Sequence, residues 1–74
     1  MNLLSPKKLL LSKWTAVLPL NKEKHFLVPK VIYSDPEEER VAHSVELEAV
    51  YSKKIRVIPW RELTDDDCWL QGWK

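Results

Sequence analysis

The stretch HFLVPKVIY, residues 25–33, decides the fold of this chain. Its β-branched and aromatic residues favour an extended strand. Pro29 interrupts the run, and because proline has no N–H to donate, it is tolerated in a strand only at an edge or at a bulge. We therefore predict one long strand from Lys24 to Ser34 that is bent or interrupted near Pro29.

Further strand-forming segments lie on both sides of this stretch. Upstream, the segment KWTAVL (13–18) has the composition of a strand, and Pro19 to Glu23 reads as a polar connection. Downstream, IRVI (55–58) follows residues 52–54, a spacing that suits a hairpin loop. The order of these segments predicts an antiparallel sheet.

Residues 36–51 allow two interpretations. Asp35 and Pro36, followed by three glutamates, are a helix-start signal. A strand would instead place on one face Val41, Val45, Leu47, Ala49 and Tyr51, and on the other Ala42, Ser44, Glu46 and Glu48. We favour a strand over residues 41–51 preceded by an acidic loop, and a partly helical segment remains the alternative.

The two ends of the chain predict short helical turns. Ser5 is a favoured N-cap, and Pro6 at the first helical position costs no hydrogen bond. Near the other end, Thr64 or Asp65 can cap a short helix that exits at Gly72. The predicted fold is mainly β: a bent antiparallel four-strand sheet or an SH3-like partial barrel, with short helical turns at both ends. We expect residues 1–74 to form a single small domain.

Composition indicates a globular chain with a small core. A domain near 74 residues buries roughly 60% of the surface that its unfolded chain exposes. Hydrophobic residues make up 45% and charged residues 31%, which is a folded rather than a disordered balance. Four tryptophans, two tyrosines and one phenylalanine supply large side chains to fill that core.

Cysteine usage and hydropathy predict a soluble cytoplasmic protein. Cys68 is the only cysteine, so neither an intrachain disulfide nor a cysteine-based zinc site can form, which is typical of a reducing compartment. No signal peptide is apparent, and no apolar run approaches the roughly 20 residues of a membrane span. We expect no membrane association, and the sequence leaves the oligomeric state open.

The residues that could carry catalysis or bind a cofactor form no recognisable constellation. Cys68 with His25 or His43 would be a nucleophile and base, but nothing in the sequence places them together. Three consecutive aspartates, 65–67, are poorly arranged to converge on one cation. Gly72 is the only glycine, which excludes a glycine-rich phosphate loop. We expect no catalytic residues, no metal and no cofactor.

Two binding functions remain. A protein-interaction module could grip an extended peptide between aromatic side chains. Alternatively, single-stranded nucleic acid could stack on exposed tryptophans while Lys and Arg contact phosphates. The net charge is only +1, because the basic first 34 residues are balanced by an acidic segment over 35–51, so long-range attraction to nucleic acid is weak. A protein partner is the leading hypothesis.

Six blocks of the sequence carry a family resemblance: Ser5–Leu10, Ser12–Ala16, Asn21–Phe26, Leu47–Val50, Trp60–Leu63 and Trp69–Lys74. Together they resemble a family of small tryptophan-rich bacterial proteins of unknown function, nearly end to end. The resemblance implies no activity, ligand or cofactor. The candidate binding surface comprises polar and aromatic members of these blocks: Lys13, Trp14, His25, Trp60, Arg61, Trp69 and Trp73. Local sequence predicts that Trp14 and Trp69 are core residues and that Trp60 and Trp73 are more exposed.

Overall fold

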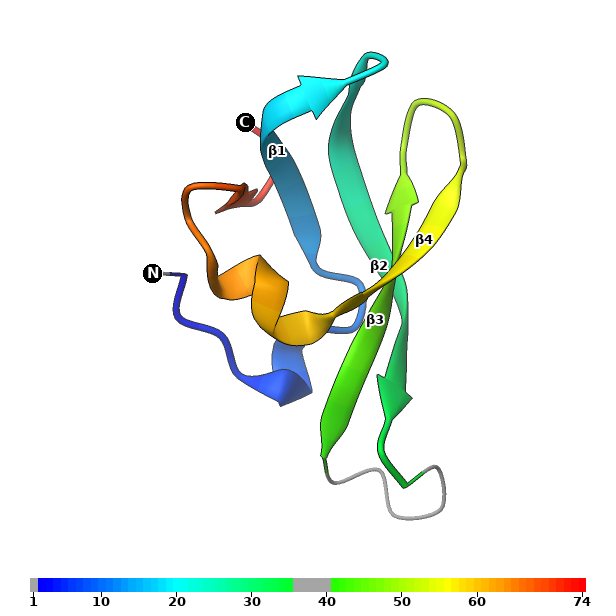
Figure 1. Cartoon of the computed structure of the whole chain (residues 1–74), viewed down its shortest axis with the longest axis vertical. Helices are drawn as coiled ribbons and strands as arrows, with labels where there is room; N and C mark the ends of the chain where they lie inside the picture. Colours follow the sequence, from blue (N-terminus) through cyan, green and yellow to red (C-terminus); the bar gives the residue numbers. More distant parts are fainter. Residues whose placement is uncertain (1, 36–40) are drawn as a thin grey trace.

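The fold is a single antiparallel sheet of five strands in the order β4-β3-β2-β1-β5 (Figure 1). The computed structural model describes residues 2–35 and 41–74. Its elements are the 3-10 turn η1 (Pro6–Lys8), β1 (Lys13–Leu20), β2 (Glu23–Tyr33), β3 (Ala42–Ala49), β4 (Ile55–Pro59), the 3-10 turn η2 (Trp60–Thr64) and β5 (Trp69–Gln71). The mainly β prediction is confirmed, but the prediction of four strands is wrong because a fifth forms near the C-terminus. In the described part of the chain, no helix is long and apolar enough to cross a membrane.

The long strand predicted from residues 24–34 is β2, which lies at the centre of the sheet. Its register against β3 shifts between Leu27 and Lys30. This irregularity accommodates Pro29, since a proline inside a paired strand removes one ladder hydrogen bond. The predicted interruption at Pro29 is therefore a bulge in a central strand.

The strand interpretation of the next segment is confirmed over Ala42–Ala49. Val45, Leu47 and Ala49 point into the core as predicted. Val41 and Tyr51 are exposed, contrary to prediction, because both lie outside β3. Ala42, predicted on the opposite face, is buried since the register shifts where it pairs with Tyr33. Residues 36–40 of the predicted acidic loop lie outside the described residues.

The connection between β1 and β2 is shorter than the sequence suggests. Pro19 and Leu20 still belong to β1, and Glu23 already belongs to β2. Only Asn21 and Lys22 form the turn, with φ of 55° and 64°. Two consecutive residues with positive φ give the turn whose twist matches an antiparallel hairpin.

The short helix predicted from Thr64 or Asp65 to Gly72 is wrong. The helical turn η2 comes earlier, and after Asp65 the chain forms a turn and then β5, which pairs with β1. The aspartates give a local helix signal, but burial of Trp69 against Phe26 requires an extended chain and outweighs it. Gly72 does have the expected left-handed φ of 82°, at the end of a strand.

The N-terminal turn η1 is confirmed, with Pro6 at its first position.

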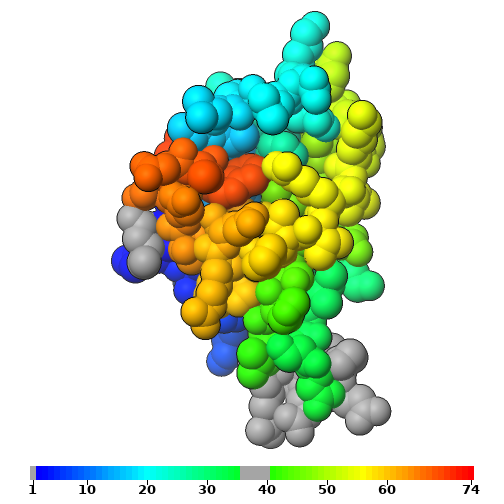
Figure 2. Space-filling view, in the orientation of Figure 1, coloured from blue at the N-terminus to red at the C-terminus, as the bar shows by residue number. Residues whose placement is uncertain are grey.

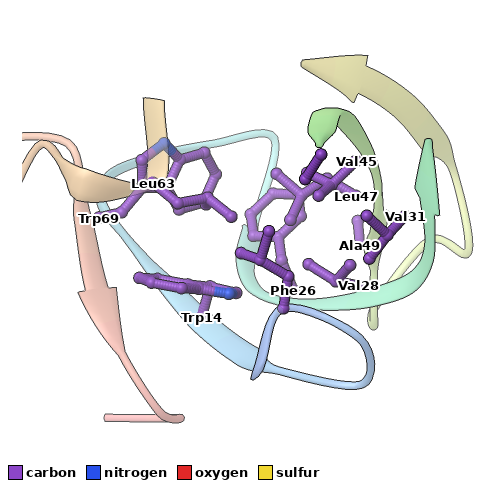
Figure 3. Close-up of a cluster of buried hydrophobic side chains, with 11 residues drawn as sticks. Trp14, Phe26, Val28, Val31, Val45, Leu47, Ala49, Leu63 and Trp69 are labelled. Atoms are coloured by element: carbon purple, nitrogen blue, oxygen red, sulfur yellow. The ribbon is translucent and has the colours of Figure 1, made fainter. Parts of the chain in front are cut away.

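The core lies on the concave side of the bent sheet. In Figure 3, Trp14, Leu63 and Trp69 gather at one end of the cluster, and Val28, Val31, Val45 and Ala49 at the other. Trp14 and Trp69 are buried, as predicted. The Trp14 indole N–H donates a hydrogen bond of 2.8 Å to Ser12 Oγ, so its one polar atom is satisfied. Two of the four indoles are thus committed to stability.

We expect Leu47→Ala to destabilise the domain strongly. Leu47 is completely buried. Truncating a buried leucine costs about 2–5 kcal/mol, a large share of the roughly 5–15 kcal/mol that holds a typical domain together. Urea unfolding followed by tryptophan fluorescence measures the loss. The control is Val57→Ala, whose side chain is 57% exposed and whose stability should change by no more than about 0.5 kcal/mol. Equal losses in both variants would contradict the assigned core.

Candidate functional site

The seven residues of the predicted binding surface lie in three separate places. Trp14 and Trp69 are core residues and contribute little surface. Trp60 and Arg61 lie in η2, which packs against β3, with the Arg61 guanidinium 5.7 Å from the Trp60 ring centre. Trp60 is half-buried against the core rather than freely exposed. The remaining three residues, Lys13, His25 and Trp73, come together.

The C-terminal segment lies across β1 and β2, on the face of the sheet opposite the core. The Trp73 indole N–H donates to the Phe26 carbonyl oxygen at 3.0 Å. The Thr15 hydroxyl donates to the Gly72 carbonyl at 2.7 Å and accepts the Lys74 N–H at 2.9 Å. These bonds explain why Thr15, a polar residue, is buried. They also fix the position of the Trp73 ring.

Lys13, His25 and Trp73 form a cationic aromatic surface, here named the Trp73 patch. Lys13 Nζ lies 4.7 Å from the centre of the Trp73 ring, within cation–π range. The His25 ring lies 6.0 Å from the same ring, and His25 Nε2 lies 3.0 Å from the Lys74 carbonyl oxygen. Trp73 remains 45% exposed, as predicted for this residue. In this patch the Trp73 indole is fixed by its hydrogen bond to Phe26 but remains accessible to solvent, beside the positive charge of Lys13.

A second surface, which the sequence analysis missed, is a groove between the C-terminal half of β1 and the start of β4. One hollow of about 320 Å³ and an adjoining one of about 270 Å³ share Ala16, Leu18 and Arg56. We name their combined surface the β1–β4 groove; its aliphatic and aromatic residues and its central arginine are Ala16, Leu18, Leu20, Phe26, Ala49, Ile55, Arg56, Ile58 and Trp69. In Figure 2, the cyan end of β1 and the yellow β4 lie on either side of the red segment that carries β5.

Leucine side chains on the β1 side of the β1–β4 groove are uncovered. Leu18 is 82% exposed and Leu20 is 73% exposed. The guanidinium of Arg56 lies 5.5 Å from the Phe26 ring centre and 5.7 Å from that of Trp69. The groove thus combines accessible aliphatic walls with one cation held over two aromatic rings.

One sequence signal could have revealed this groove. The segment AVLPL, residues 16–20, is apolar at every position. A strand with one solvated face alternates apolar and polar residues, so an unbroken apolar run in a small sheet must leave some side chains uncovered. Assigning Pro19 and Leu20 to a polar connection concealed that signal.

The histidines and the cysteine do not assemble a nucleophile and base among the described residues. Cys68 Sγ donates to Asp65 Oδ2 at 3.5 Å, and this hydrogen bond to a carboxylate raises the pKa of the Cys68 thiol. His43 Nδ1 lies 2.7 Å from Ser44 Oγ, whereas His25 lies beside Lys74. The raised pKa favours the protonated, less nucleophilic form of this exposed thiol.

The three aspartates 65–67 are exposed, and one oxygen from each lies within 4.8 Å of the others. Asp65 is already engaged in local structure, because its Oδ1 accepts the Asp67 N–H at 2.9 Å and its Oδ2 accepts the Cys68 thiol. This is the pattern of an aspartate that stabilises a turn. The cluster is accounted for by the turn that leads into β5.

We expect Asp65→Asn to lower the pKa of the Cys68 thiol, because it removes the carboxylate that favours the protonated form. More thiolate at a given pH should speed alkylation by iodoacetamide, and the rate should reach its plateau at a lower pH. Asp67→Asn is the control, since Asp67 acts only through its charge and should have a smaller effect. Identical pH profiles for wild type and Asp65→Asn would show that the Asp65 contact does not control this thiol.

The fold and these two surfaces define a small, mainly β domain in which tryptophans serve both the core and the exterior. The chain belongs to the tryptophan-rich protein family DUF2389, whose model matches residues 12–74, a segment that contains all four tryptophans. This confirms the resemblance to a tryptophan-rich family of unknown function. No curated protein and no solved structure matches the chain.

Proposed function

We propose that this domain is a non-catalytic binding module that holds an extended segment of a protein partner in the β1–β4 groove. The observation that carries the proposal is the exposure of Leu18 and Leu20, at 82% and 73%, on the wall of a hollow surface. Apolar side chains that line a concave surface commonly mark interaction sites, because covering them releases ordered water.

The sheet edge supports an extended rather than a helical occupant. β4 ends the sheet order, so one side of this strand has no partner strand among the described residues. An edge strand leaves backbone N–H and C=O groups available to a further strand, and peptide segments bind many β-domains in this way. The exposed Ile55 and Arg56 lie on this same strand.

We further propose that the fold is an SH3-like partial barrel. Two features support it: the strand order β4-β3-β2-β1-β5, and the 3-10 turn η2 that joins the two edge strands. The contact of Arg56 on β4 with the Trp69 ring on β5 brings those edges near each other. On this interpretation, the β1–β4 groove lies where the curled sheet fails to close.

We expect Leu18→Asp to abolish capture of a protein partner. A charge on the groove wall disfavours burial of the apolar surface around it, so retention should fall at least tenfold. The measurement is affinity capture from nuclease-treated native lysate, quantified by mass spectrometry. Leu11→Asp is the matched control, since Leu11 is also exposed but does not line the groove. Failure to find any protein whose retention depends on Leu18 would refute the proposal.

A second candidate function is binding of single-stranded nucleic acid at the Trp73 patch. The observation that favours it is the half-exposed Trp73 ring beside Lys13 Nζ, which pairs a stacking surface with a phosphate-binding cation. In this case oligo-dT should quench tryptophan fluorescence at low salt, and added salt should weaken binding steeply.

For this second function, Lys13→Gln should weaken oligo-dT binding several-fold, because it removes the cation next to the stacking ring. Lys53→Gln removes an equal charge in the β3–β4 turn and should have little effect. The measurement is a fluorescence titration at two salt concentrations. Absence of quenching at low salt would eliminate nucleic acid as a ligand of this patch.

A further inference from the structure

Arg56 occupies the middle of the β1–β4 groove and, of the residues that the structure describes, is the one cationic side chain that lines both of its hollows. It pairs in register with Leu47, whose side chain is completely buried, so Arg56 projects from the concave face of the sheet. Its guanidinium lies over the rings of Phe26 and Trp69. Stacking of this kind holds the plane of the guanidinium and leaves the N–H groups at its edge to other partners.

Within residues 2–35 and 41–74, the guanidinium of Arg56 makes aromatic contacts but no hydrogen bond or ion pair. In the free domain this costs little, because Arg56 is exposed and water satisfies its five N–H donors. The situation changes when a partner covers the groove. A purely apolar segment would displace that water and leave a charged group without a partner, which is strongly unfavourable.

We propose that the β1–β4 groove recognises an extended peptide segment in which an aspartate or glutamate lies between apolar residues, and that Arg56 receives its carboxylate. This inference rests on the proposed function and specifies its partner. A carboxylate can accept two parallel N–H bonds from a guanidinium, which replaces the lost water. The flanking apolar side chains then cover Leu18 and Leu20 on one side and Ile58 on the other.

The other charges of the groove favour a central position for the acid. Glu62 and Asp67 lie at the end formed by η2 and the turn before β5. Glu23 lies at the opposite end beside Lys54, and it already accepts a hydrogen bond from Ser52 Oγ. A carboxylate of the bound peptide at the η2 end would be repelled by Glu62 and Asp67. At the other end, the repulsion from Glu23 would be nearly cancelled by the attraction of Lys54. Arg56 therefore offers the favourable position for an acidic side chain.

A second copy of this chain paired through β4 offers no acid to Arg56. β4 is the segment IRVIP, which contains no acidic residue. When two β4 strands pair about a two-fold axis, each residue of β4 faces a residue of the other copy's β4, so Arg56 faces no carboxylate. An acidic segment from another protein supplies one.

The experiment is selection of random ten-residue peptides displayed on phage against the folded 74-residue chain. Wild type should enrich peptides with Asp or Glu between apolar residues, and Leu18→Asp should lose them. Arg56→Gln should lose the acidic enrichment, and Arg56→Glu should select Lys or Arg at that position. Because Arg56 is exposed, these variants should remain folded, which the unfolding midpoint checks.

A double-mutant cycle on the most enriched peptide makes the test quantitative. Changing its acid to the matching amide should weaken binding at least tenfold to wild type and leave binding to Arg56→Gln unchanged, as measured by fluorescence polarisation. Arg56→Lys keeps the charge without the paired geometry and should retain an intermediate affinity.

The outcomes separate the two proposals. If the selected peptides depend on Leu18 but show no preference for an acid, the proposed role of Arg56 is wrong, and the groove remains a binding site. The same conclusion follows if Arg56→Gln still selects acidic peptides. Absence of any Leu18-dependent peptide overturns both. A wild-type dimer in sedimentation that Leu18→Asp dissociates would show instead that a second copy occupies the groove.

Discussion

The contact between Trp69 and Phe26 is the interaction on which the rest of this structure depends. The two rings meet edge to face, with centres 5.2 Å apart and planes at 88°. They join β5, the last strand, to β2 at the centre of the sheet. Burial of Trp69 fixes β5 against β1, and the backbone that continues from it carries Trp73 to the opposite face. The same two rings support the guanidinium of Arg56. Core packing and both candidate surfaces therefore share one aromatic pair.

The parts of the fold that could be predicted from the sequence are those set by local pattern. β2 and most of β3 follow from β-branched residues and alternation, and the bulge follows from Pro29. β5 could not be found in this way, because three residues carry too short a pattern and the preceding aspartates favour a helix start. What makes Trp69 extended is its contact with Phe26, 43 positions earlier in the chain. Such long-range burial overrides local propensity and leaves no local signal.

The candidate site likewise depends on long-range contacts that the local sequence does not reveal. Aromatic content indicated that tryptophans would contribute to the core and to a binding surface. Local sequence correctly predicted that Trp14 and Trp69 are buried and that Trp73 is exposed. It could not group Lys13, His25 and Trp73, since their proximity requires the register of β1 with β2 and a C-terminal segment folded over both. Nor could it identify Arg56, which resembles any exposed arginine until the pairing with Leu47 turns it toward the concave face.

The separation between core and groove has a physical consequence. Leu47, Leu63 and Trp14 are completely or almost completely buried, whereas Leu18 and Leu20 remain largely in water. A domain of this size has little apolar area to spare, and each leucine left exposed forgoes about 1.5–3 kcal/mol of burial. The fold therefore does not depend on these two side chains. Their removal from the groove wall leaves the aromatic contact between β2 and β5 intact, so the residues that hold the domain together are distinct from those that we propose hold its partner.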